Sequence, residues 1–215
     1  MRYDQLLSLV ALYKPRSIVE IGTNQGDRGV LLCREALRHN PVVAYTGYDV
    51  FDTKDAEFHK QVFNGKGAFA KERVAARFDE INSQYPGFQY RLLQGTTAET
   101  LHSHDVRAEF VFIDGDHRVQ TIALDYDAVK HSKVVVFDDY YSEAPDCEKI
   151  DTSIYGCNSI IDKSKSATVL PNADRFPATG DIRMAALVKR HVFFRGSKKG
   201  PSSQGYGFSS GRVWM

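Results

Sequence analysis

The chain has 215 residues and a mass of 24.2 kDa, which suits one domain with a sizeable core. Hydrophobic residues make up 42% and charged residues 26%, and 28 basic against 27 acidic residues leave a net charge of +1. A charge so near neutrality creates no overall field that would favour nucleic acid or a membrane surface. No apolar run approaches the roughly 18 residues that a membrane span needs.

The amino-terminal segment and the cysteines indicate the compartment. Residues 1–14 lack a long apolar stretch followed by a small-residue cleavage site, so we expect no secretion signal. Three cysteines at irregular spacing (Cys33, Cys147 and Cys157) suggest neither a disulfide framework nor a zinc site. We therefore expect a cytoplasmic protein.

Strands and helices are predicted to alternate along the chain. The expected strands cover residues 17–22, 42–51, 88–94, 110–114 and 134–139, with two late strands at 167–171 and 184–190. The expected helices cover residues 3–13, the segment between Gly26 and Asn40, 66–85 and 119–129, with a short turn near 96–101. This alternation indicates an α/β fold of the Rossmann-like, doubly wound type, with a mostly parallel seven-stranded sheet and helices on both faces.

Two segments are harder to interpret. Residues 140–165 have a mixed pattern, within which 153–162 could form a helix over a pocket. Residues 195–215 contain five glycines, five serines, four basic residues and no acidic one. This composition predicts a flexible tail after a domain at 1–194. A basic arm for nucleic acid or a phosphorylated partner, and docking of Trp214, stay open.

Carboxylates close two neighbouring predicted strands. Asp114 follows the apolar run Phe110–Ile113, and Asp138 and Asp139 follow the run Val134–Phe137. Carboxylates resist burial, so their placement there is a poor choice for stability alone. Because parallel strands bring their carboxyl ends to one edge of the sheet, these acids are predicted to converge in one crevice.

A glycine turn ends the first predicted strand. The segment Glu20–Gly26 reads EIGTNQG, in which glycines allow backbone amides to approach a ligand. Its spacing does not match the dinucleotide pattern G-x-G-x-x-G, and a turn without a ligand stays open. Asp49 closes the second strand, where an acid can accept hydrogen bonds from ribose hydroxyls.

Together, these motifs resemble the ordered motifs of class I S-adenosylmethionine-dependent methyltransferases. The segments that carry the resemblance are Glu20–Gly26, Asp49, Gly95–Thr97, Phe112–His117 and Val136–Tyr140. The likeness covers roughly residues 15–190. It is greatest to small O-methyltransferases related to macrocin-type sugar O-methyltransferases and, more distantly, catechol O-methyltransferase. The FIDGDH block followed by DDY is its specific part.

The resemblance implies a cofactor half and an acceptor half of one site. The residues expected around the methionine portion of S-adenosylmethionine are Glu20, Gly22, Thr23 and Gly26. Asp49 would bind the ribose, and Gly95 with Thr96 would border the adenine. Asn24 replaces a commoner glycine, which leaves the path of the loop open.

In metal-dependent members of that family, three acidic or amide residues hold a divalent cation. Asp114, Asp138 and Asp139 stand at those positions. Mg²⁺ prefers oxygen ligands and would orient a substrate hydroxyl while lowering its pKa. His117 is the candidate general base, with Asp114 as a further candidate catalytic residue. A metal-free site with Asp114 or Asp138 as base, and a helix-capping role for Asp116, stay open.

The predicted function is therefore methyl transfer from S-adenosylmethionine to a hydroxyl of a small molecule, with Mg²⁺ assistance. The acceptor would be a sugar, a polyketide-like compound or a phenol, selected by residues 1–15 and 142–165. Three alternatives stay open: a metal-independent enzyme, an N-methyltransferase and a non-catalytic S-adenosylmethionine-binding protein. The resemblance also leaves a homo-oligomer open, whereas nucleic acid and membrane partners are not expected.

Overall fold

A computed structural model describes residues 1–53, 57–58 and 67–189 of the chain. Its centre is a seven-stranded sheet in the order β3-β2-β1-β4-β5-β7-β6. The strands are β1 (Ser17–Ile21), β2 (Val43–Asp49), β3 (Phe88–Gln94), β4 (Phe110–Ile113), β5 (Val134–Ser142), β6 (Ala167–Phe176) and β7 (Gly180–Val188). The first five strands run parallel, and β7 is antiparallel to both neighbours. The α/β, mostly parallel prediction is confirmed.

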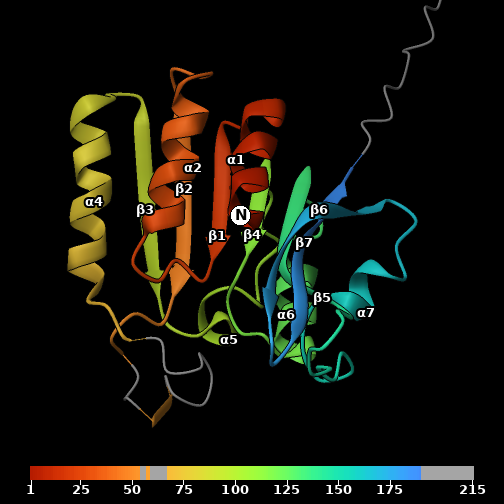
Figure 1. Ribbon diagram of the computed structural model, residues 1–215. Helices are drawn as coiled ribbons and strands as arrows, with labels where there is room; N and C mark the ends of the chain where they lie inside the picture. Colours follow the sequence, from red (N-terminus) through yellow and green to blue (C-terminus); the bar gives the residue numbers. More distant parts are fainter. Residues whose placement is uncertain (54–56, 59–66, 190–215) are drawn as a thin grey trace, which may run out of the picture.

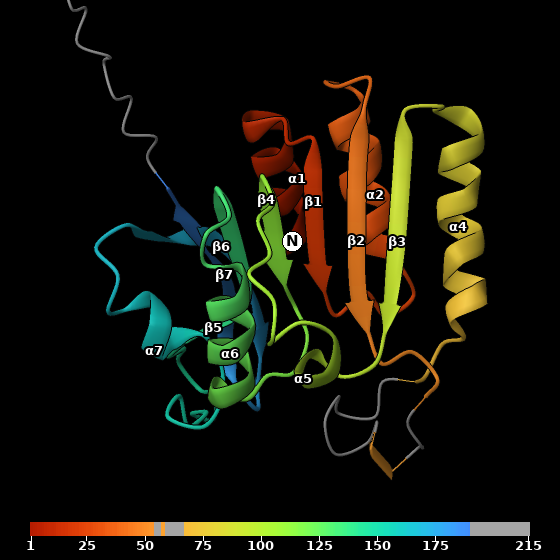
Figure 2. The ribbon, with the colours of Figure 1, turned by 180° about the vertical axis from the view of Figure 1, so that it is seen from behind.

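Helices cover both faces of the sheet. They are α1 (Arg2–Tyr13), α2 (Asp27–Leu37), α4 (Lys71–Gln84), α5 (Thr97–Thr100), α6 (Val119–Val129) and α7 (Asn158–Ile161). Figure 1 shows α1 and α2 in front of the sheet, and Figure 2, the view from behind, shows α6 on the opposite face. The buried apolar residues accordingly form two clusters, one on each side of the strands.

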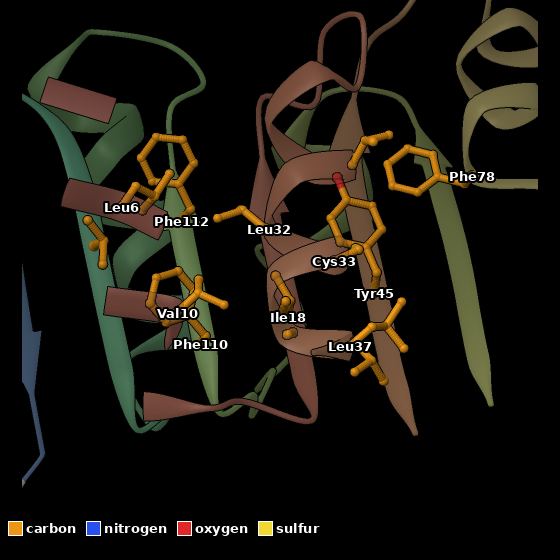
Figure 3. Packing of buried hydrophobic residues seen from close by; sticks show 14 of the residues in the cluster. Leu6, Val10, Ile18, Leu32, Cys33, Leu37, Tyr45, Phe78, Phe110 and Phe112 are labelled. Atoms are coloured by element: carbon orange, nitrogen blue, oxygen red, sulfur yellow. The ribbon is translucent and has the colours of Figure 1, made fainter. Parts of the chain in front are cut away.

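The larger cluster fixes α1 on the sheet. Leu6 and Val10 of α1 are fully or almost fully buried, and Figure 3 shows them beside Phe112 and Phe110 of β4. These residues lie four positions apart, on one side of the helix, so a single face is buried. The first turn of α1 is thereby held close to the central strands.

The expected helix at 153–162 is present only as the single turn of α7. Gly156 has a φ of +87°, which a continuous right-handed helix does not allow. Residues 151–155 instead form a turn in which the Ile154 and Tyr155 amides donate to the Asp151 carbonyl. The strand at 88–94 and the helix at 119–129 occur with the predicted bounds, and most other expected elements have ends shifted by a few residues. β5 and β6 continue past the predicted ends, and β7 starts before the predicted strand.

The tail expected at 195–215 lies outside the described residues. Among the helices of the described residues, none combines the length and apolar character that a membrane span requires.

Candidate active site

The turn after β1 fits closely against the end of β4. Gly22 has a φ of +90°, and a Cβ atom added to it would lie 2.0 Å from the Asp114 carbonyl oxygen. Both observations require glycine at this position. Asn24 adopts a φ of +51°, a conformation that asparagine tolerates better than most residues. The loop therefore keeps a left-handed turn without a glycine there.

Glu20 lies beneath this turn and is fully buried. Its Oε2 atom accepts a hydrogen bond from the Tyr45 hydroxyl, while Oε1 has no hydrogen-bond partner among the described residues. Burial raises the pKa of the Glu20 carboxyl to about 8, against the opposing effect of the Tyr45 hydrogen bond. Thr23 is also buried, with its hydroxyl 3.4 Å from that of Tyr45. The unpartnered oxygen is suited to accept a hydrogen bond from a ligand.

Glu20→Gln is expected to remove a pH-dependent loss of stability. The pKa of the Glu20 carboxyl is higher in the folded than in the unfolded protein. The stability that protonated Glu20 contributes is therefore fully present below about pH 4.5 and is lost as the pH rises through about 8. The free energy of unfolding of the wild type should fall across this window relative to the variant, by an amount on the order of 3 kcal/mol. Urea unfolding at pH 5, 7 and 9 measures the difference.

The exposed Glu72 of α4 offers a matched control. Glu72→Gln should follow the wild-type pH dependence, since that side chain is in water in both states. A Glu20→Gln protein with the same pH profile as the wild type would contradict the prediction.

Asp49, at the end of β2, joins two loops. Its carboxylate accepts hydrogen bonds from the backbone amides of Asn24 and Phe51, both at 2.7 Å. It also lines a cavity of about 330 Å³ together with Gly22, Gly95 and Thr96. Four of the predicted cofactor residues thus border one cavity, whereas Glu20 and Thr23 are buried nearby and Gly26 caps α2.

The three acids at the ends of β4 and β5 come together. One ligand oxygen from each of Asp114, Asp138 and Asp139 lies within 4.8 Å of the others. Successive side chains of a regular strand point to opposite faces, but the pairing of β5 with β7 shifts between Phe137 and Tyr140. Asp139 has a φ of +58° at this irregularity. The bulge therefore allows two consecutive carboxylates to reach one cluster.

Asp138 is held by the first turn of α1. Its Oδ1 and Oδ2 atoms accept hydrogen bonds from Nε and Nη2 of Arg2, both at 2.9 Å, and Oδ2 also accepts one from the Tyr3 hydroxyl at 2.8 Å. Burial alone would raise the pKa of the Asp138 carboxyl, but the hydrogen bonds and charge of Arg2 outweigh it and lower that pKa. Asp138 is therefore an ionised, paired group.

A second arginine faces the cluster from α2. Arg28 Nη1 lies 3.4 Å from Asp114 Oδ2, and its guanidinium stacks 3.7 Å from the centre of the Tyr3 ring. Arg28 and Tyr3 thus connect α1, α2 and the end of β4 around the acids.

His117 and Asp139 form a pair at the acid cluster. The imidazole Nδ1 is hydrogen-bonded to Asp139 Oδ2. His117 precedes α6 rather than beginning it, and neighbouring Asp116 accepts hydrogen bonds from the Arg118 amide at 3.0 Å and the Thr121 hydroxyl at 2.9 Å. Asp116 therefore stabilises the start of α6.

Sequence reasoning missed Arg2, Tyr3 and Arg28. An isolated arginine before an amphipathic helix carries no signal of its partner, because Arg2 and Asp138 are 136 positions apart. It also missed His102, whose Nε2 is 2.7 Å from the buried Asp125 and which lines the cavity beside Thr96.

Comparison with protein families decides the assignment. A model described as a methyltransferase domain matches residues 19–140, more than half of the chain. The chain belongs to this methyltransferase family. Its matched region runs from β1 to β5, and so includes the glycine turn and the acid cluster.

Solved structures share the fold of this methyltransferase. The O-methyltransferase TomG of Streptomyces achromogenes, involved in tomaymycin synthesis and solved with S-adenosylmethionine, is 18% identical, with a TM-score of 0.55 over 87% of this chain and 79% of its own. An O-methyltransferase of Bacillus cereus solved with S-adenosylhomocysteine is 16% identical, with a TM-score of 0.56 over 86% and 79%. No curated protein matches the chain.

Proposed function

We propose that this methyltransferase transfers the methyl group of S-adenosylmethionine to a hydroxyl group of a small molecule. The observation that carries the proposal is the His117–Asp139 pair beside the acid cluster, at the sheet edge that also bears the glycine turn. A base positioned by a carboxylate is what removal of a hydroxyl proton requires. The two O-methyltransferases of the same fold support the choice of oxygen as acceptor.

The cavity lined by Gly22 and Asp49, together with the buried Glu20 nearby, is suited to S-adenosylmethionine. The unpartnered Oε1 of Glu20 is suited to an ammonium group, and the cavity bordered by Gly22 and Asp49 is suited to a nucleoside. Gly95 and Thr96 would border the base. When bound, the cofactor supplies a methyl group on positively charged sulfur, which needs alignment rather than further activation.

His117 would accept the proton of the acceptor hydroxyl. Asp139 fixes the ring through Nδ1 and would stabilise the imidazolium that forms. The loop before α7 supports both residues, because the Gly156 amide donates to the His117 carbonyl at 2.8 Å and the Cys157 amide donates to the Asp139 carbonyl at 3.1 Å. This loop and the first turn of α1 would therefore border the acceptor.

The donor set does not fit Mg²⁺ while α1 is seated. Octahedral Mg²⁺ holds its oxygens about 2.1 Å away, so opposite ligands are about 4.2 Å apart. The acid cluster is only slightly wider, at up to 4.8 Å. However, both oxygens of Asp138 already accept hydrogen bonds from Arg2. The Mg²⁺ predicted from the sequence would have to displace this arginine.

A transfer assay tests the proposed function. Protein is incubated with S-adenosylmethionine carrying a labelled methyl group and a panel of phenols, sugars and matched amines, and products are identified by mass spectrometry. We expect label on oxygen and roughly 10²-fold or greater loss of turnover in His117→Ala, as is typical for loss of a general base. Transfer to amines only would refute oxygen as the acceptor. Failure to bind S-adenosylmethionine in calorimetry would refute the proposal as a whole.

A further inference from the structure

A protein cation already lies at the acid cluster. The Arg2 guanidinium donates one hydrogen bond to each carboxylate oxygen of Asp138, and Arg2 is only 7% exposed. Its Nη1 also lies 3.1 Å from Asp174 Oδ2 on β6. Planar, two-point contacts of this kind are specific to guanidinium and are stronger than neutral hydrogen bonds. Arg2 is therefore a built part of the acid cluster.

The rest of α1 keeps this arginine in place. Leu6 and Val10 are buried in the core, so the helix axis is fixed independently of the charge contacts. Near its start, Gln5 Oε1 accepts a hydrogen bond from the Asn172 amide of β6 at 2.9 Å. Arg2 is therefore carried by a packed helix and held at its guanidinium by the carboxylates of Asp138 and Asp174.

Two of the three acids already face a protein cation. Arg2 is paired with Asp138, and Arg28 Nη1 is 3.4 Å from Asp114. The two carboxylate oxygens of Asp138 already accept three hydrogen bonds, two from Arg2 and one from Tyr3. Few of their lone pairs are therefore left for a metal. A divalent cation here would meet two guanidinium charges and a carboxylate with little capacity left for coordination.

We propose that Arg2 is the resident cation of the acid cluster, and that a bound divalent cation and the contact of the Arg2 guanidinium with Asp138 exclude one another. Arg2 thus acts as a positioning residue: it fixes the Asp138 carboxylate, donates to the Tyr3 hydroxyl and holds the start of α1 beside the acids. The consequence that methyl transfer proceeds without a divalent cation rests on the proposed function. The competition between Arg2 and a divalent cation for Asp138 is independent of that function.

Binding of Mn²⁺, measured by electron paramagnetic resonance of the free ion, tests the competition without any turnover. The proteins compared are the full-length wild type, Arg2→Met, Arg2→Lys, Asp138→Asn and the double variant Arg2→Met/Asp138→Asn. Arg2→Met removes the charge but keeps much of the apolar stem, and should bind one Mn²⁺ at least about tenfold more tightly than the wild type. The double variant should lose that gain.

Arg2→Lys is a second variant that tests the proposal if Arg2→Met does not fold. Lysine keeps the charge but cannot bridge both carboxylate oxygens, so its Mn²⁺ affinity should lie between those of the wild type and Arg2→Met. Circular dichroism shows which proteins are folded. Tight Mn²⁺ binding by the wild type that Asp138→Asn abolishes would overturn the proposal. So would folded Arg2 variants with wild-type Mn²⁺ affinity.

The same samples separate the two proposals. If Mn²⁺ binding follows the expected order but no acceptor hydroxyl is methylated, the competition stands and the proposed function fails. If O-methylation is observed and requires a cation bound through Asp138, the proposed function stands and the role of Arg2 is refuted.

Discussion

Asp138→Ala is expected to lower the free energy of unfolding by about 3–5 kcal/mol, because it leaves the Arg2 guanidinium buried without its partner. The Asp138 side chain is 2% exposed and that of Arg2 is 9% exposed, so water cannot replace the lost contact without moving α1. Urea unfolding followed by circular dichroism measures the change. The affinity for S-adenosylmethionine should change little, because Asp138 does not line the cavity bordered by Asp49.

The double variant Arg2→Met/Asp138→Leu separates loss of the pair from loss of one partner. Replacing a buried ion pair by apolar residues of similar size is often close to neutral, so most of the lost stability should return. Asp105→Ala is the matched control. Asp105 also accepts two hydrogen bonds from one arginine, Arg107, but both side chains are exposed, so the expected loss of stability is much smaller.

Equal stability of Asp138→Ala and the wild type would show that the Arg2–Asp138 contact does not hold α1 in solution. A double variant as unstable as Asp138→Ala would instead attribute the loss to packing around the acid cluster.

Gly22→Ala is expected to reduce the affinity for S-adenosylmethionine at least about 100-fold. A Cβ at Gly22 would overlap the Asp114 carbonyl oxygen at 2.0 Å, so the ends of β1 and β4 would have to separate. The φ of +90° adds backbone strain for any residue with a Cβ, on the order of 1–2 kcal/mol. Because Gly22 also borders the cavity, the separation changes the shape of the expected cofactor site. Isothermal titration calorimetry measures the affinity.

Gly67 provides the control for this substitution. Among the described residues, no heavy atom lies within 4 Å of a Cβ added there, so Gly67→Ala should bind the cofactor like the wild type. An affinity of Gly22→Ala within threefold of the wild type would mean that the close approach of the two loops does not shape the cofactor site.

The elements that local pattern predicts well are those whose apolar residues repeat with one period. The strand at 88–94 and the helix at 119–129 occur with the predicted bounds, because alternation and helical spacing are properties of adjacent residues. The segment at 153–162 was predicted less well. Its apolar residues suit a helix, but the positive φ of Gly156 follows from its close approach to the Asp139 carbonyl and the Tyr141 ring.

Local residue patterns were enough to predict the order of strands and helices, the glycine turn and the acids at the ends of β4 and β5. Each of these depends on neighbouring residues and on the rule that parallel strands end at one edge. The contacts of Arg2 and Tyr3 with Asp138, and the bulge that brings Asp139 into the same cluster, became known from the folded structure alone. Pairing across 136 positions arises from the packing of α1 on the sheet, which no local pattern encodes.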